Sequence, residues 1–136
     1  LSDDLRKEIA ACEKDTATGD GVILNVALNY GGRMEIVQAV QQIAREVKSG
    51  ALDAESITEE TISSHLYPSD AQDVDLMIRT GGESRISNFL LWQISYGELY
   101  FTPVLWPDFT EEELSKAIDW FTGRDRRFGG LTEDKK

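Results

Sequence analysis

The chain has 136 residues, of which 40% are hydrophobic and 29% are charged, a composition typical of one soluble globular domain with a buried core. Its formal net charge of −11 argues against a nucleic-acid-binding surface, because phosphate backbones are bound by positively charged fields. The single cysteine, Cys12, cannot form an internal disulfide, and no apolar run approaches the roughly 20 residues that span a bilayer. We also expect no signal peptide. We therefore expect a soluble protein of a reducing compartment.

The first thirty residues predict a helix and then a buried strand. Leu5, Ile9 and Cys12 recur at i, i+4 and i+7, as on the packed face of a short helix. Because this helix opens the chain with no strand ahead of it, we expect part of a larger fold to precede it. Residues 22–28 are almost continuously apolar, which is typical of a strand buried on both faces of a parallel sheet.

A glycine turn and a longer helix follow this strand. Gly50 stands where a left-handed cap would end the helix, and the strand, turn and helix together make half of a βαβ unit. Gly31 and Gly32 at the start of the helix have two explanations, a tight turn or an anion site built from first-turn N–H groups. The apolar residues at helical spacing are Ile36, Val37, Val40, Ile43, Ala44 and Val47.

Residues 57–66 predict a further helix that is ended by Pro68. Ile62 and Leu66 are expected to face inward. We interpret His65, the only histidine, as a structural residue and not as a metal ligand or a base.

The stretch after a polar loop carries the strongest chemical signal. Residues 74–78 are mostly apolar and predict a buried strand, and Gly81 and Gly82 break it. Glycines tolerate a sharp reversal that leaves backbone N–H groups pointing outward, as in an anion cradle. Arg79 and Arg85 flank the break at the carboxyl end of the strand, where open α/β sheets bind ligands, and a guanidinium fork fits phosphate oxygens. We interpret this stretch as a diphosphate site.

A simpler interpretation of the same stretch stays open. Arg79 could pair with Asp75 or Glu83, and the two glycines could be only a turn. The hydroxyl groups of Ser84 and Ser87 in the same loop favour the diphosphate interpretation.

The C-terminal third predicts a helix, a strand and a final helix. Residues 88–96 are apolar on several sides and predict a buried helix, and residues 97–101 predict a short strand. Glu98 near the start of that strand is costly unless it is paired or bound to a cation. Thr110 and Glu113 predict a capping box. The final helix is expected to bury Leu114, Ala117, Ile118 and Phe121 and to end at Gly123, and the three tryptophans are interpreted as core residues.

A family resemblance rests on residues Asp75 to Phe109, which read DLMIRTGGESRISNFLLWQISYGELYFTPVLWPDF. This stretch resembles the cis-prenyltransferases, and most closely the bacterial undecaprenyl diphosphate synthases; NYGGR at 29–33 and RRFGG at 126–130 support the match. The family has an α/β fold with a parallel β-sheet flanked by helices, works as a homodimer, and uses Mg²⁺ to elongate an allylic diphosphate with isopentenyl diphosphate. The resemblance implies a cytoplasmic enzyme that makes polyprenyl (undecaprenyl) diphosphate for the cell-wall lipid carrier, and it leaves open transient contact with a membrane surface.

The resemblance also implies roles for individual residues. Glu98 matches a magnesium ligand of the family. Arg127 and Gly129 match an Arg-x-Gly motif that reaches toward the active site of the partner subunit, while the backbone of Ile86 lies in the loop that holds isopentenyl diphosphate. The substrate-binding residues implied in this way are Arg79, Arg85, Ile86, Ser87, Arg127 and Gly129.

Two departures limit what the resemblance implies. Ser84 stands where related bacterial enzymes often carry a histidine near the metal. The aspartate-glycine-asparagine-glycine-arginine loop, which binds the allylic diphosphate and supplies the family's essential aspartate, has no counterpart here. We therefore expect residues 1–131 to be the C-terminal part of one truncated catalytic domain, followed by a polar tail at 132–136. This chain alone, with no catalytic residue of its own, is expected to make no polyprenyl product.

Two other classes of function compete with this one. A non-catalytic partner subunit would keep the fold and dimer surface, but such a subunit is expected to lose the diphosphate arginines that this chain retains. A nucleotide-binding doubly wound domain is disfavoured because no G-x-G-x-x-G or Walker sequence follows either predicted strand.

Overall fold

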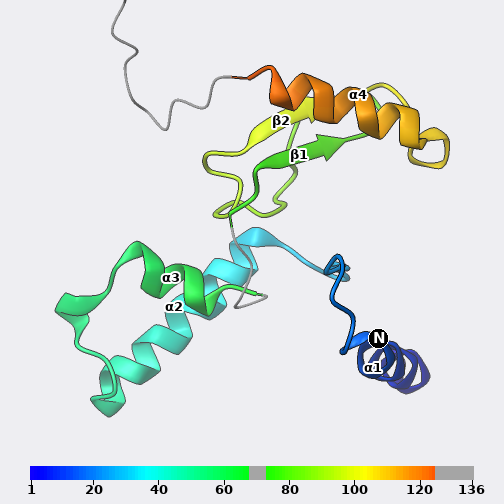
Figure 1. The fold of residues 1–136 in the computed structure, drawn as a ribbon. Coiled ribbons are helices and arrows are strands. Elements are labelled where there is room, and N and C mark those ends of the chain that lie inside the picture. Colours follow the sequence, from blue (N-terminus) through cyan, green and yellow to red (C-terminus); the bar gives the residue numbers. More distant parts are fainter. Residues whose placement is uncertain (68–72, 125–136) are drawn as a thin grey trace, which may run out of the picture.

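The computed structural model describes residues 1–67 and 73–124 as an α/β arrangement in which two groups of elements stack on one another (Figure 1). One group contains a two-stranded sheet and the last helix, and the other contains the two central helices. The elements in chain order are α1 (Asp3–Thr16), α2 (Gly32–Ser49), the 3-10 turn η1 (Ala54–Ser56), α3 (Glu59–His65), β1 (Leu76–Arg79), β2 (Glu98–Phe101), the 3-10 turn η2 (Trp106–Asp108) and α4 (Glu111–Thr122).

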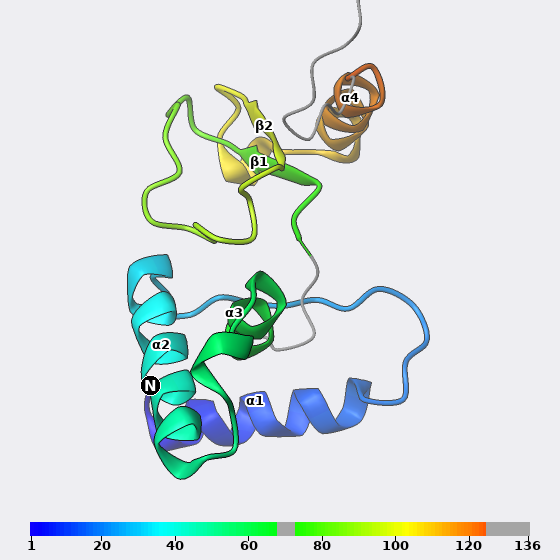
Figure 2. The same ribbon diagram turned by 90° about the vertical axis from the view of Figure 1, so that its left-hand side faces the viewer.

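The sheet confirms the predicted α/β class with parallel strands. β1 and β2 pair in parallel, with Leu76 opposite Glu98 and Arg79 opposite Phe101. The chain can pass close beside the start of β1 because residue 97 is glycine: a Cβ atom on Gly97 would lie 2.5 Å from the carbonyl oxygen of Val74. Helix α4 covers one side of β2, as Figures 1 and 2 show from two directions.

Helix α2 forms with the predicted cap but with a different buried face. Gly50 adopts the left-handed conformation at φ 77° and ends the helix, as expected. The predicted apolar face is only partly buried, since Val37 and Val40 are exposed. The buried stripe of the helix consists of Gly32, Glu35, Ala39 and Ile43. A charged residue therefore occupies a core position of this helix.

Helix α3 packs beside α2, and Figure 2 shows the two side by side. A reciprocal pair of hydrogen bonds between Thr58 and Thr61 caps its start. Leu66 is buried as predicted and Ile62 is half-buried. The predicted terminator Pro68 lies outside the described residues.

Two predictions for the N-terminal part are wrong. Residues 22–28 form no strand, and their apolar side chains lie in the open, with Val22 97% exposed. A strand needs a neighbour to receive its backbone hydrogen bonds, and in the described part of the chain no strand pairs with this segment. Helix α1 forms as predicted and is capped by Ser2, but it buries none of its residues and lies apart from the other elements (Figure 1).

Three predictions for the C-terminal third are also wrong. Residues 88–96 form a series of turns instead of a helix, because Asn88 and Leu90 hold positive φ angles that right-handed helices exclude. Thr110 begins α4 without a side-chain capping bond, and the Glu113 carboxylate binds Lys116 at 2.6 Å instead. Trp106 is no core residue, since it is 75% exposed and stacks on Phe109.

The last helix is only partly buried. Ala117 is fully buried, Phe121 is half-buried, and Leu114 and Ile118 are exposed, so the predicted apolar face is only partly covered. The helix ends at Gly123 as predicted. Arg126, the predicted boundary at residue 131 and the tail at 132–136 lie outside the described residues. Within 1–67 and 73–124, every helix is too short or too polar to cross a bilayer.

Candidate functional site

Arg79, the last residue of β1, is held in place by the loop that follows it. Its Nη1 atom donates to the hydroxyl oxygen of Ser87 at 3.0 Å and to the backbone carbonyl of Arg85. Three of the predicted site residues therefore come together at the carboxyl end of β1. Ile86 lies between them in sequence, half-buried, and its carbonyl accepts from the N–H of Phe89 at 3.1 Å. A guanidinium fixed on one edge in this way can offer its remaining N–H groups to a bound anion.

Arg85 forms an exposed ion pair with Glu83. The pair answers one alternative left open by the sequence, because Glu83 binds Arg85 and not Arg79. With side-chain exposures of 63% and 47%, such a pair contributes at most about 1 kcal/mol. An anion can therefore replace Glu83 as the partner of Arg85 at small cost.

The glycine pair does not form the predicted anion cradle. Gly81 and Gly82 adopt positive φ angles of 86° and 78°, which explains why both are glycine. Their N–H groups, however, donate to the carbonyls of Val104 at 2.8 Å and Thr102 at 2.9 Å. The pair docks the loop onto the segment after β2, so any anion here must be bound by side chains.

The second glycine pair, at the start of α2, also does not form the predicted anion site from first-turn N–H groups. The N–H of Gly32 donates to the carbonyl of Asn88 at 2.8 Å, and the N–H of Arg33 donates to the Asn88 Oδ1 atom at 2.9 Å. The turn explanation is therefore the better one. Asn88 was not among the residues predicted from the sequence, and its polar character inside an apolar run was the available signal.

Glu98 stands at the other end of the strand pair. It lies opposite Leu76, three residues along the ladder from Arg79, which is about 10 Å at the usual strand rise. Its side chain is 20% exposed, and its Oε2 atom binds the Nε atom of Arg124 at 3.2 Å. The guanidinium of Arg124 also lies 5.1 Å from the centre of the Trp120 ring. This carboxylate is paired, as the cost of burying it requires.

The donor set around Glu98 is compatible with one mode of metal binding. No cluster of three or more His, Cys, Asp or Glu side chains occurs in the part of the chain that the structure describes. Mg²⁺ is commonly held by one or two carboxylates together with substrate phosphates and water, so a single Glu fits that mode if Arg124 releases it. Arg127 and Gly129 lie outside the described residues.

A buried carboxylate on α2 binds the segment between β1 and β2 through a hydrogen bond from Gln93. Glu35 is fully buried, and it accepts hydrogen bonds from Tyr30 Oη at 2.5 Å, from Tyr67 N at 3.0 Å and from Gln93 Nε2 at 3.0 Å. Burial, and then the hydrogen bond to Glu35, raises the pKa of Tyr30 above its ordinary value. Glu35 was likewise not predicted from the sequence, although a glutamate within the helical stripe of Ala39 and Ile43 was a visible signal.

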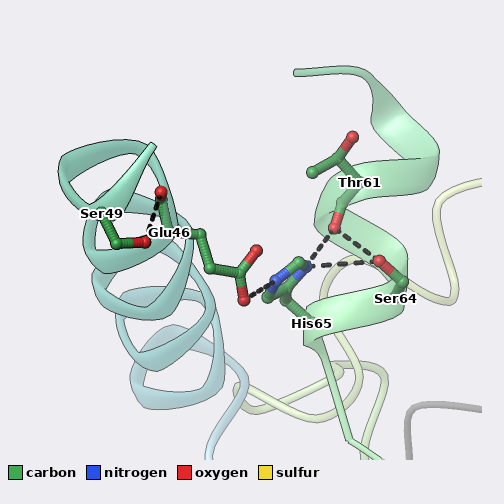
Figure 3. A network of polar contacts seen from close by, with 5 residues as sticks. All are labelled: Glu46, Ser49, Thr61, Ser64 and His65. Atoms are coloured by element: carbon green, nitrogen blue, oxygen red, sulfur yellow. Dashed lines mark hydrogen bonds and ion pairs between the residues drawn. The ribbon is translucent and has the colours of Figure 1, made fainter. Parts of the chain in front are cut away.

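His65 has the structural role that its isolation predicted. Its Nε2 atom lies 3.0 Å from Oε1 of Glu46 on α2, and its Nδ1 atom lies 2.6 Å from the carbonyl of Thr61 (Figure 3). The imidazole joins α3 to α2 and lies outside the cluster of Arg79, Arg85 and Ser87.

Known proteins similar to the chain are prenyl diphosphate synthases. A family model described as "Putative undecaprenyl diphosphate synthase" matches residues 1–129. The chain is 55% identical over 136 residues to the ditrans,polycis-undecaprenyl-diphosphate synthase ((2E,6E)-farnesyl-diphosphate specific) of Vibrio vulnificus (strain YJ016), and it covers 54% of that protein. It is 50% identical over 131 residues to an isoprenyl transferase of Halalkalibacterium halodurans, covering 96% of this chain and 51% of the relative.

Solved structures agree with these relatives. Lavandulyl diphosphate synthase from Lavandula x intermedia, in complex with dimethylallyl diphosphate, matches with a TM-score of 0.91 and 40% identity over 95% of this chain and 56% of that one. A probable undecaprenyl diphosphate synthase from Campylobacter jejuni matches with a TM-score of 0.79 and 40% identity over 95% and 58%. The chain thus spans about half the length of the relatives it matches. With a family model over residues 1–129 and relatives of about half identical sequence, the chain belongs to the undecaprenyl diphosphate synthase family of cis-prenyltransferases.

Proposed function

We propose that this chain is the isopentenyl-diphosphate-binding part of a cis-prenyltransferase. The whole enzyme condenses isopentenyl diphosphate with an allylic diphosphate to make polyprenyl (undecaprenyl) diphosphate for the cell-wall lipid carrier. The single observation that supports this most strongly is the Arg79 guanidinium, which Ser87 and the carbonyl of Arg85 hold at the carboxyl end of β1. Family membership supplies the reaction class.

The proposed role of the two arginines is to position the substrate that attacks. Arg79 offers a planar fork that fits two phosphate oxygens, and Arg85 exchanges Glu83 for the same diphosphate. Ser87 keeps the Arg79 fork turned toward the loop. Fixing the diphosphate at one end aligns the double bond with the allylic carbon, which is a contribution of proximity and orientation.

Glu98 is the proposed ligand of Mg²⁺. When bound, the metal would stabilise the negative charge that builds on the departing diphosphate. The Oε2 atom of Glu98 binds Arg124, so a metal on that oxygen would compete with this ion pair. The register of the sheet places Glu98 three residues along the ladder from Arg79, and Glu98 would hold the metal on the same strand pair that carries the arginine.

The remaining proposals concern partners. We place the enzyme in the cytoplasm, as a homodimer in which Arg127 and Gly129 reach the partner's active site, with transient contact with a membrane surface and no nucleic-acid partner. Because the chain lacks the aspartate-containing loop, we propose that it makes no polyprenyl product by itself.

Calorimetric titration of the 136-residue chain with isopentenyl diphosphate and Mg²⁺ tests the site. We expect Arg79→Ala to weaken binding at least about tenfold, since charge-assisted hydrogen bonds contribute roughly 1.5–3 kcal/mol. Arg79→Lys is expected to bind poorly as well, because an ammonium group cannot reproduce the fork.

The matched control is Arg45→Ala. Arg45 is exposed and lies about 20 Å along α2 from the first residue of that helix. This variant is expected to bind as the unaltered chain does. Equal affinities for Arg79→Ala and Arg45→Ala would remove the site assignment. Isopentenol, which lacks the diphosphate, should give no heat with any of the chains.

A further inference from the structure

The loop that supplies Ser87 is held in an unusual backbone conformation. Ser87, Asn88 and Leu90 have φ angles of 47°, 66° and 45°, although none of them is glycine. Each such residue costs roughly 1 kcal/mol or more, so the surrounding structure must hold the loop in place.

Asn88 is the point at which the loop is held. Its backbone carbonyl and its Oδ1 atom accept from the consecutive N–H groups of Gly32 and Arg33, at 2.8 and 2.9 Å. These two donors belong to the first turn of α2, whose N–H groups have no partner inside the helix. Asn88 therefore caps α2 from a position 55 residues further along the chain.

The glycines at the start of α2 make room for this contact. A Cβ atom on Gly31 would lie 2.9 Å from Asn88 Nδ2, and one on Gly32 would lie 3.2 Å from the Asn88 carbonyl and 2.9 Å from Leu91 Cγ. Neither glycine needs a positive φ, because Gly31 has φ −159° and Gly32 is helical. Close approach of residues 88–91 is thus the physical reason for both glycines.

Asn88 directly follows the residue that holds the arginine. Ser87 Oγ accepts from Arg79 Nη1 at 3.0 Å, so α2, Asn88, Ser87 and Arg79 form one continuous chain of contacts. We propose that Asn88 is a positioning residue of the diphosphate site, which clamps the loop to α2 and thereby keeps the Ser87 hydroxyl against the Arg79 guanidinium. The expected effect of Asn88 on diphosphate binding rests on the proposed function. Its expected effect on the order of the Arg79 side chain does not.

The first test follows the Arg79 side chain without any ligand. The heteronuclear NOE of the Arg79 Nε–Hε group, measured by ¹⁵N NMR, reports whether the guanidinium is ordered. We expect it to be ordered in the unaltered chain and mobile in Asn88→Gly, which removes the Oδ1 acceptor without adding backbone strain. Asn88→Asp keeps an acceptor and tolerates the left-handed backbone, so it should restore the order.

Two further variants keep this test decisive. Asn29→Gly is the matched control, because Asn29 is also an asparagine at positive φ (54°) and is not the residue that caps α2. Its Arg79 signal should stay ordered. Gly31→Ala places a methyl group against the Asn88 side-chain amide and should also make the Arg79 side chain mobile. This variant provides the test if Asn88→Gly does not fold. An Arg79 that stays ordered in both Asn88→Gly and Gly31→Ala, or in the one of them that folds, would overturn the proposal.

The second test measures binding of isopentenyl diphosphate with Mg²⁺ by calorimetry. Asn88→Gly is expected to raise the dissociation constant about tenfold, as the loss of one oriented charge-assisted contact would, whereas Asn29→Gly leaves it unchanged. If Arg79→Ala binds normally, the proposed function fails, and the NMR result still decides the role of Asn88. If Arg79→Ala binds weakly while Asn88→Gly binds normally, the positioning role alone fails.

Discussion

The imidazole of His65 lies between two acceptors, Oε1 of Glu46 at 3.0 Å from Nε2 and the carbonyl of Thr61 at 2.6 Å from Nδ1 (Figure 3). A neutral imidazole can donate from only one of its nitrogens, whereas the protonated ring donates from both. The hydrogen bond to Glu46, and then the one to Thr61, raises the pKa of His65. The contact therefore joins α2 and α3 most strongly when His65 is charged.

This contact predicts a dependence of stability on pH. Because folding raises the pKa of His65 above its unfolded value of about 6.5, the stabilisation is fully present below that pH and is lost as the pH rises through the folded pKa. Glu46→Gln should lower the melting temperature more at pH 5.5 than at pH 8.5 when each is compared with the unaltered chain. The difference should be less than about 1 kcal/mol, since Glu46 is partly exposed. The exposed Glu55→Gln should show no such pH dependence.

The buried carboxylate of Glu35 predicts a large loss of stability on truncation. Glu35→Ala would leave the N–H of Tyr67 and the amide of Gln93 without their acceptor and would open a cavity, at a cost of about 3 kcal/mol or more. Glu35→Gln keeps one acceptor oxygen and should cost about 1 kcal/mol. Urea unfolding measures both, and the exposed Glu8→Ala serves as the control. A loss for Glu35→Ala no greater than for Glu8→Ala would contradict the assigned role.

The close approach at Gly97 predicts a steric effect on the sheet. A methyl group there would meet the Val74 carbonyl at 2.5 Å, so Gly97→Ala must push β2 away from the chain that leads into β1. We expect a loss of about 2 kcal/mol, typical of overpacking. Gly21→Ala meets no atom within 4 Å and should change the free energy of unfolding by less than about 0.5 kcal/mol. Thermal unfolding of the two variants makes the comparison, and similar melting temperatures would show that the close approach at Gly97 does not constrain the sheet.

The ion pair between Glu98 and Arg124 predicts opposite effects for its two members. If Glu98 holds Mg²⁺, Glu98→Gln should remove the magnesium dependence of isopentenyl diphosphate binding. Arg124→Ala frees the carboxylate and should preserve or strengthen that dependence. Titration of the ligand at several Mg²⁺ concentrations gives the measurement. A purely structural pair would lose stability in both variants and leave the magnesium dependence unchanged.

Several predictions from the sequence were right because they depend on neighbours along the chain. Helical spacing of apolar residues located α1, α2, α3 and α4, and short apolar runs located β1 and β2 within about two residues. Gly50 ends α2 in the left-handed conformation that was expected of it.

The wrong predictions mostly concern partners that are distant in sequence. The run at 22–28 has the composition of a buried strand, but burial depends on a neighbour that the described residues do not supply. The N–H groups of Gly81 and Gly82 were expected to face an anion, and they face the carbonyls of Val104 and Thr102, beyond the second strand. The composition of a segment limits which structures it can form, and the hydrogen-bond partners that the fold brings close decide which of them it adopts.

The sequence by itself determined the family, the positions of most helices and strands, and the grouping of Arg79 with Arg85 and Ser87 of the loop after it, because each of these follows from residues close together in the chain. Only the tertiary structure decided how that loop is held. Asn88 reaches the start of α2 across 55 residues, and Gln93 reaches Glu35 across 58. Such contacts leave no periodic trace in the sequence, since a polar side chain can be satisfied by any donor or acceptor that the fold brings within about 3 Å.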